Sequence, residues 1–301
     1  MLFNRKTTQH LSSRSRYLAD RSAKVAVIIC ASMSFIILLA ILVFILKEGL
    51  PAFSKVGFFQ LLFGTEWRPS NGQYGLLPMI AGSLIVTFGS LLLAVPLGIA
   101  CAILLAEVAP LRVRQILRPA VELLVGIPSV VFGLVGMLVI VPSIRQIGGT
   151  GYSVLAACIV LMAMVLPTII SISDDSIRVV PRKYKEGSLA MGATHWQTIW
   201  HVLIPAARSG IGAAVVLGVG RAIGETMAMI MVIGNAVIFP DSLLSPARTL
   251  TGNIAVEIQY ASGTHASALF ATAVVLLAFI VILNTITVNI FKRGIGDRTK
   301  C

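Results

Sequence analysis

The stretch KYKEGSLAMGATHWQTIWHVLIP, residues 183–205, lies between long apolar runs and differs from them in composition. It is too polar to cross a membrane and too apolar to be a fully solvated loop. Pro181, just before it, can begin a helix, because proline is tolerated in the first helical turn. The stretch predicts a short surface helix presented to a partner, which small residues allow to approach closely. These small residues are Gly187, Ser188, Ala190, Gly192 and Ala193.

The overall composition indicates a membrane protein. Of the 301 residues, 57% are hydrophobic and only 12% are charged, whereas a soluble domain of this size needs far more polar surface. The net charge of +12 would suggest nucleic acid in a soluble protein. Here a membrane explains it better, because basic residues collect in cytoplasmic loops. We therefore expect contact with membrane lipid and none with nucleic acid.

Six segments are long and apolar enough to be transmembrane helices, which need about 20 mostly apolar residues. A backbone that crosses lipid must satisfy its own hydrogen bonds, so these spans are expected to be helical. The first span is too long for a signal peptide and is interpreted as a retained anchor. The sequence thus predicts an all-α membrane protein with six transmembrane helices. The segments are 25–46, 79–106, 120–142, 152–172, 211–238 and 267–290.

The distribution of lysine and arginine predicts the orientation. With the N-terminus in the cytoplasm, 18 of the 24 basic residues fall on the inner side and five on the outer side. This asymmetry favours a multi-pass protein with both termini in the cytoplasm. The predicted organisation is a basic cytoplasmic tail (1–24), an anchor helix (25–46), a periplasmic loop (47–78), a transmembrane domain (79–290) that includes the inner loop 173–210, and a cytoplasmic tail (291–301).

Residues typical of enzymes and metal sites are scattered. The four cysteines have no zinc-like spacing, and His195 and His201 are six residues apart rather than the four of a helical metal pair. Asp174 and Asp175 are adjacent, so on a helix they point about 100° apart. The chain also lacks the G-x-x-x-x-G-K-[ST] phosphate loop. We expect no catalytic residue, no metal and no cofactor on this chain, so a separate subunit would have to bind any ATP.

The stretch GIPSVVFGL, residues 126–134, has two interpretations. Gly126 and Pro128 are ordinary components of membrane helices, in which glycine and proline are frequent. Alternatively, they break the helix and form a hinge or line a pathway.

Two charges interrupt the apolar run GVGRAIGETMAMIM, residues 218–231. Arg221 and Glu225 are four residues apart, so on a continuous helix they share a face and can touch. A charge at mid-bilayer costs about 2.5–3.5 kcal/mol or more, so stability alone does not explain them. Such residues usually face a bundle interior or a polar pathway, and the planar fork of an arginine can hold a tetrahedral oxyanion. The alternative is a buried pair that only fixes helix packing.

Gly220 and Gly224 accompany the two charges in the same run. Their spacing lets two membrane helices pack closely. We therefore expect this span to lie at an interface with a second membrane subunit, with Arg221 near the seam.

The spacing of Glu186, Gly192 and Pro205 resembles the EAA loop of ABC importer permeases. Gly187 and Ser188 replace the two alanines of that family pattern. The resemblance implies that the segment is a coupling helix, which contacts a cytoplasmic ATPase and transmits its closure. The alternative is an amphipathic helix on the inner leaflet. The residues implied in coupling are Tyr184, Glu186, Gly187, Ala190, Gly192, Ala193 and Trp196.

The run GRAIGETM also resembles the permeases of high-affinity phosphate (Pst) importers, and the PstC type more than the PstA type. The resemblance extends over most of the chain, including the segment 64–87. It implies a type I ABC importer (MetI-like) permease fold in a bacterial inner membrane. It further implies that Arg221, Glu225 and Thr226 line the phosphate pathway.

The same resemblance implies a set of partners. These are a second, homologous permease, two cytoplasmic ATPase subunits that bind ATP and Mg, and a periplasmic or extracellular phosphate-binding protein. Two alternatives remain at this point. One is a permease of the same architecture for another oxyanion, such as molybdate or sulfate. The other is a stand-alone anion carrier or channel, which would be expected to contain inverted repeats.

Overall fold

The computed structural model describes residues 13–296, with side chains for residues 20–290. Six helical segments are long and apolar enough to cross a membrane, so the predicted all-α architecture with six spans is confirmed. A two-stranded hairpin is the one sheet among the described residues, and the end of the bundle that holds it is called the outer end after the predicted orientation. Residues 1–12 and 297–301 of the two predicted tails lie outside the described part.

Each span is a helix or a stack of helical segments. Three spans contain a π-helical turn, which ends the second span and lies inside the third and fifth. The spans are α1 (Ser13–Lys55); α3 (Leu77–Ile103) with η2 (Leu104–Val108); α5 (Ser129–Val135) with η3 (Gly136–Ile140) and α6 (Val141–Ile147); α7 (Val154–Arg178); α9 (His195–Thr198) with η4 (Ile199–Leu203) and α10 (Ile204–Gly224); and α13 (Gly263–Gly296). The shorter elements are α2 (Phe58–Phe63), β1 (Trp67–Arg68), η1 (Pro69–Asn71), β2 (Gln73–Tyr74), α4 (Leu111–Val125), α8 (Arg182–Ala190), α11 (Met227–Val232) and α12 (Leu250–Glu257).

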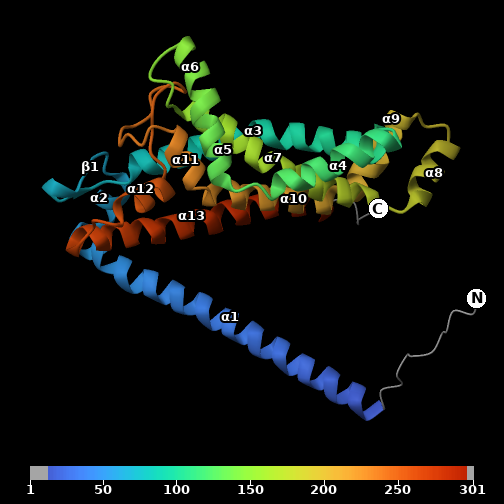
Figure 1. Cartoon of the computed structure of the whole chain (residues 1–301), viewed down its shortest axis with the longest axis horizontal. Coiled ribbons are helices and arrows are strands. Elements are labelled where there is room, and N and C mark those ends of the chain that lie inside the picture. The colour runs from blue at the N-terminus through green and yellow to red at the C-terminus, as the bar shows by residue number, and fades with distance from the viewer. Residues whose placement is uncertain (1–12, 297–301) are drawn as a thin grey trace, which may run out of the picture.

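The helices α3, α7, α10 and α13 lie side by side in one elongated bundle (Figure 1). α7 is central, since it packs against α3 and α10. Glycines permit the close approach of these helices: a Cβ at Gly98 of α3 would lie 2.7 Å from the Ile169 side chain, and one at Gly218 of α10 would lie 3.1 Å from it. Backbone packing around α7 therefore fixes where the side chains of α10 point.

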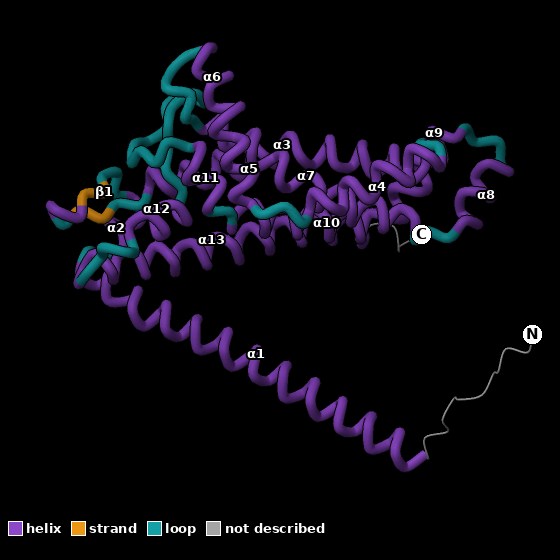
Figure 2. The backbone as a smooth tube through the Cα atoms, viewed as in Figure 1, coloured by secondary structure: helices purple, strands orange, loops and turns teal. Residues whose placement is uncertain are grey.

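α1 leaves the bundle at its outer end and runs away from it (Figures 1 and 2). It contacts α13 near the outer end, where the rings of Phe44 and Phe270 meet edge to face at 5.5 Å. Most of its apolar side chains are exposed. Residues 25–41 of α1 are all exposed, so this part of the helix presents a largely apolar surface on all sides.

The fifth span differs from its predicted bounds of 211–238. It begins at His195 and ends at Gly224. A capping box between Thr194 and Gln197 starts the helix, and Pro205 stands in the first turn of α10, where its missing N–H costs little. Because α7 also continues to Arg178, the non-spanning inner segment is shorter than the predicted loop 173–210.

The third span is interrupted at the GIPSVVFGL stretch. α4 ends at Val125 and α5 begins at Ser129, with Pro128 in extended conformation between them. The predicted span 120–142 is therefore two helices, and the apolar segment that can cross the membrane is Ser129–Ile147. Gly126 and Pro128 lie at the junction.

A buried carboxylate joins the outer hairpin to the bundle. Glu257 of α12 accepts hydrogen bonds from Trp67 Nε1 at 2.8 Å and from Arg248 Nη1 at 2.5 Å, and its Oε2 lies 2.9 Å from His265 Nε2. The Trp67 ring also packs against Tyr74. One acidic side chain thus connects the outer loop, the segment before α12 and the start of α13.

Candidate anion pathway and coupling surface

Arg221 lies in the last turn of α10 and faces α7. Its Nη1 donates a hydrogen bond to Thr168 Oγ1 at 3.0 Å. The contact is possible because Gly218, one turn earlier, lets α10 approach Val165 and Ile169 of α7. Arg221 is half-buried, so its guanidinium is held between protein and open space.

The charge of Arg221 has no counter-charge among the side chains that the structure describes. No described carboxylate oxygen lies within 4.0 Å of its guanidinium. A half-buried cation without a counter-charge is costly, and an anion that reached it would form charge-assisted hydrogen bonds. The site is therefore suited to transient binding of an oxyanion.

The expected contact between Arg221 and Glu225 is wrong. α10 ends at Gly224, and Glu225 is extended, with φ −69° and ψ 128°. Its Oε1 instead accepts a hydrogen bond from the Ala228 N–H at 3.0 Å, in the first turn of α11, where a negative charge is favourable. The predicted contact required a continuous helix, but this span breaks between Gly224 and Met227. Thr226 lies in the same break and donates to the Gly224 carbonyl at 3.2 Å.

Gly220 and Gly224 face open space in this chain. A Cβ built at either position would meet no atom within 4 Å among the described residues. The surface beside Arg221 is therefore uncovered here, and its packing against a second subunit stays a prediction.

Hydroxyl groups that were not predicted from the sequence lie around the break at the end of α10. Glu225 lines a small cavity together with Ser83, Thr87, Thr249 and Thr251. Thr251 Oγ1 donates to the Glu225 carbonyl at 3.0 Å. Ser83 and Thr87 are four residues apart, which is the one local sign that their hydroxyls share a helix face.

The predicted coupling residues lie on α8, on α9 and on the turn between them. Six of the seven are exposed, and Ala193 is half-buried. Gly192 has φ +85°, a left-handed conformation that favours glycine and ends α8. Met191 is 89% exposed and Trp196 is 58% exposed, so this segment offers an apolar surface away from the bundle.

An ion pair links the predicted coupling segment, which comprises α8, α9 and the turn between them, to η2 at the inner end of α3. Lys185 Nζ on α8 bonds to the Glu107 carboxylate on the π-helical turn η2, and His195 Nε2 lies 3.9 Å from the same carboxylate. Ser188 and Thr198 also meet, oxygen to oxygen, at 3.0 Å. Glu107 therefore links α8 directly to η2.

Arginine side chains donate hydrogen bonds to backbone carbonyls at the inner end of η2. Its carbonyls Leu105 O and Ala106 O accept hydrogen bonds from Arg114, at 2.8 and 2.5 Å, and Leu105 O also accepts one from Arg178 at 3.0 Å. Carbonyls at a helix end lack partners within the helix, and arginines satisfy them well. η2 is therefore anchored to both α4 and α7.

Carboxylates extend this arginine cluster. Arg118 pairs with Glu122 at 3.1 Å and with Asp175 at 2.7 Å, and Arg178 pairs with the buried Asp174 at 2.8 Å. The hydrogen bond to Glu122 and the charges of Asp175 and Asp174 raise the pKa of Arg118 above its ordinary value, so it stays protonated. The cluster holds α4 against α7 close to the coupling segment.

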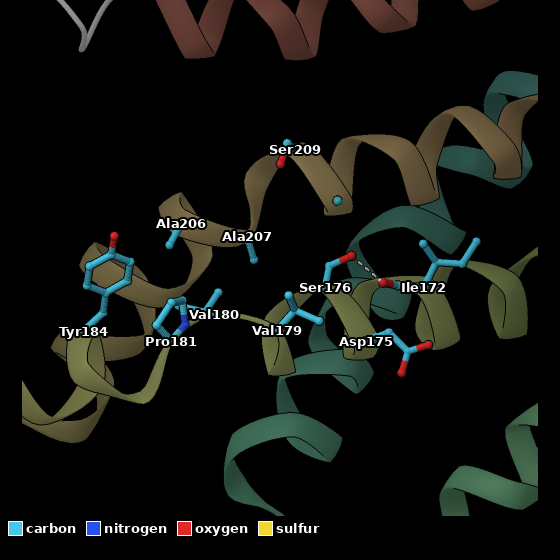
Figure 3. A pocket seen from close by; sticks show the side chains of 11 residues that line it. Ile172, Asp175, Ser176, Val179, Val180, Pro181, Tyr184, Ala206, Ala207 and Ser209 are labelled. Atoms are coloured by element: carbon cyan, nitrogen blue, oxygen red, sulfur yellow. Dashed lines mark hydrogen bonds between the residues drawn. The ribbon is translucent and has the colours of Figure 1, made fainter.

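A groove of about 520 Å³ lies between the C-terminal part of α7, the start of α8 and the first turns of α10. Figure 3 places Tyr184 and Pro181 at one end of it and Ile172 and Ser176 at the other. The groove therefore connects the start of the coupling segment to the seam between the two helices.

These features define a class of protein. An apolar helix bundle contains an uncompensated arginine beside an open surface, and an exposed helical segment is tied to the inner end of the bundle. Such an arrangement is typical of a membrane permease. The chain belongs to the family of binding-protein-dependent transport system inner membrane components, whose family model matches residues 94–296. It is thus a permease subunit of an ABC transporter and a multi-pass inner-membrane protein.

Curated relatives share most of the chain. It is 46% identical to the probable ABC transporter permease protein YqgH of Bacillus subtilis (strain 168), over 82% of each chain. It is 30% identical to the phosphate transport system permease protein PstC of Pasteurella multocida (strain Pm70), over 95% of this chain and 96% of that relative. The PstC of Xylella fastidiosa (strain 9a5c) is 36% identical over 77% of this chain and 76% of its own.

Solved structures have the same fold. A bacterial alginate ABC transporter aligns with a TM-score of 0.63 at 17% identity and covers 95% of this chain and 98% of its own. The methionine ABC transporter MetNI in an inward-facing conformation aligns with a TM-score of 0.55 at 22% identity and covers 73% and 94%. The fold expected from the sequence, that of a MetI-like type I importer permease, is confirmed.

Proposed function

We propose that this chain is the phosphate-conducting permease subunit of an ATP-driven importer. The observation that carries the proposal is Arg221, a half-buried cation whose one described side-chain partner is a neutral hydroxyl. A tetrahedral oxyanion supplies the missing negative charge, and the guanidinium fork matches its oxygens. The PstC relatives, whose names specify phosphate transport, make phosphate the favoured oxyanion over sulfate and molybdate.

The pathway requires a second permease. The open surface at Gly220 and Gly224 and the exposed apolar sides of α1 favour a homologous membrane subunit as the neighbour. Arg221 then lies at the seam between the two permeases, as expected for a substrate route between subunits. Glu225 and Thr226 lie in the helix break that directly follows α10.

Energy comes from separate subunits. In this proposal two ATPase subunits, which bind ATP and Mg, dock on the exposed coupling segment α8–α9, and both termini of this chain face the same cytoplasmic side. A phosphate-binding protein delivers phosphate to the outer face. ATP-driven closure of the ATPases pulls α8, and the Lys185–Glu107 pair carries the movement to η2 and α3. This chain performs no covalent chemistry.

Substrate competition tests the proposal. Uptake of labelled phosphate is measured in cells that lack their own phosphate importer and carry the intact complex. We expect excess unlabelled phosphate to suppress uptake and equal excesses of sulfate and molybdate to leave it unchanged. Uptake that does not depend on this chain, or that sulfate or molybdate suppresses equally, would refute the phosphate assignment.

The Lys185–Glu107 pair gives a second test, directed at coupling. Lys185→Glu places two like charges together and is expected to reduce uptake about 3- to 10-fold, since a partly exposed pair contributes about 1 kcal/mol. The double variant Lys185→Glu/Glu107→Lys restores attraction and is expected to recover most of the rate. The measurement is phosphate uptake per ATP hydrolysed. Equal rates for the single and double variants would remove the pair from the coupling route.

A further inference from the structure

Thr168 is the side chain that holds Arg221 in place. It follows Pro167 in the middle of α7, and its Oγ1 accepts the hydrogen bond from Arg221 Nη1 at 3.0 Å. The two residues come from different helices, which pack closely because residue 218 is glycine. The position of Thr168 therefore decides where the guanidinium points.

The hydroxyl proton of Thr168 differs from those of three other hydroxyls in the bundle. Ser90, Ser176 and Thr272 donate theirs to carbonyls of the preceding turn, at 2.9, 2.6 and 2.9 Å. Within residues 20–290, Arg221 is the one side-chain partner of the Thr168 hydroxyl, and there the oxygen is the acceptor. A hydroxyl can accept and donate at once, so Thr168 has a donor to offer.

We infer that Thr168 and Arg221 together form one oxyanion site, in which Thr168 both orients the guanidinium and donates its own proton to an oxygen of the bound anion. The inference rests on the proposed function and adds a second ligand to that pathway. It assigns Thr168 the role of anion ligand and positioning residue. The ligand class is a tetrahedral oxyanion, with phosphate as the expected member.

A neutral partner suits this role better than a carboxylate. An aspartate at residue 168 would neutralise Arg221 and compete with the anion for its donors. Threonine fixes one N–H and leaves the full positive charge and the remaining donors available. The half-buried setting strengthens these hydrogen bonds relative to bulk water and keeps the anion partly hydrated.

The experiment compares Thr168→Val, which keeps the shape and removes the hydroxyl, with Thr168→Ser, which keeps the hydroxyl. Thr272→Val serves as the matched control, because it removes a helical hydroxyl that donates to the Ala268 carbonyl and makes no described hydrogen bond with Arg221. The full complex is used, and uptake of labelled phosphate, sulfate and molybdate is measured in parallel with ATP hydrolysis. A separate binding protein captures the anion from solution in the proposed mechanism, so the effect is expected in the maximal rate rather than in KM.

We expect Thr168→Val to lower the maximal uptake rate per ATP hydrolysed about 10- to 100-fold, the range for a hydrogen bond to a charged group. Thr168→Ser is expected within about 3-fold of the unmodified chain, and Thr272→Val to equal it. Adding Thr168→Val to Arg221→Lys is expected to cost much less than Thr168→Val alone, because the two residues act as one site.

The possible outcomes separate this inference from the proposed function. If Thr168→Val transports normally while Arg221→Lys does not, the inference is overturned and phosphate transport stands. If Thr168→Val lowers complex assembly and ATP hydrolysis together, its role is structural and the inference also fails. If the unmodified complex takes sulfate or molybdate instead of phosphate, the proposed function fails. The effects of Thr168→Val and Thr168→Ser are then measured on the uptake of that anion.

Discussion

Arg221→Ala is expected to reduce phosphate uptake by at least about 100-fold while the complex still assembles. The substitution removes the one cation on the proposed route together with two or more charge-assisted hydrogen bonds, each contributing about 1.5–3 kcal/mol. Arg221 makes no described ion pair, so its loss leaves no buried carboxylate unpaired. The measurement is labelled phosphate uptake at saturating phosphate, with the amount of complex in the membrane determined separately.

Two further variants show which property of Arg221 phosphate uptake requires. Arg221→Lys keeps the charge but loses the planar fork, so an intermediate loss of about 10-fold is expected. Arg145→Ala removes an exposed arginine on α6 at the outer side and is expected to leave uptake unchanged. Normal uptake by an assembled Arg221→Ala complex would show that the anion passes elsewhere.

Glu257→Ala is expected to destabilise the outer end of the molecule by about 3–5 kcal/mol, the cost of removing one partner of a buried ion pair. The Arg248 side chain is 13% exposed, and it would lose its charged partner. Trp67 Nε1 and His265 would lose their acceptor as well. The hairpin β1–β2 would then be held mainly by packing.

Thermal unfolding of the detergent-purified complex and proteolysis of the outer loop measure this effect. We expect a lower unfolding temperature and faster cleavage between residues 56 and 76. Glu66→Ala is the matched control, because Glu66 is an exposed outer-loop acid, 3.8 Å from Arg68, and such pairs contribute little. Equal stability of Glu257→Ala and Glu66→Ala would contradict the central role of Glu257.

Much of the architecture was predictable because lipid imposes simple rules. Span number follows from apolar length, and a charge in an apolar run attracts attention at once, as Arg221 did. Span ends were less predictable. Gly224 ends α10 without a proline nearby, and a glycine in a membrane helix is ordinary. The supposed contact between Arg221 and Glu225 failed for this reason.

Partners distant in sequence left no local signal. Thr168 is 53 residues from Arg221, and Trp67 is 190 residues from Glu257. A threonine after a mid-helix proline and a glutamate near an outer loop are both unremarkable in the sequence. Thr168 meets Arg221 only because α7 packs on α10, and Glu257 meets Trp67 only because the hairpin packs on α12.

The meeting of α1 with α13 has a consequence for biogenesis. Gly49 of α1 packs so closely on the Phe270 backbone that a Cβ there would lie 2.9 Å away. Since α1 precedes α13 in the chain, it is synthesised before the helix against which it packs. A truncated product leaves α1 without its contact in this chain, and exposed, unpaired segments of this kind favour misassembly and degradation. The packing of α1 on α13 is thus expected to form only after α13 has been synthesised and inserted.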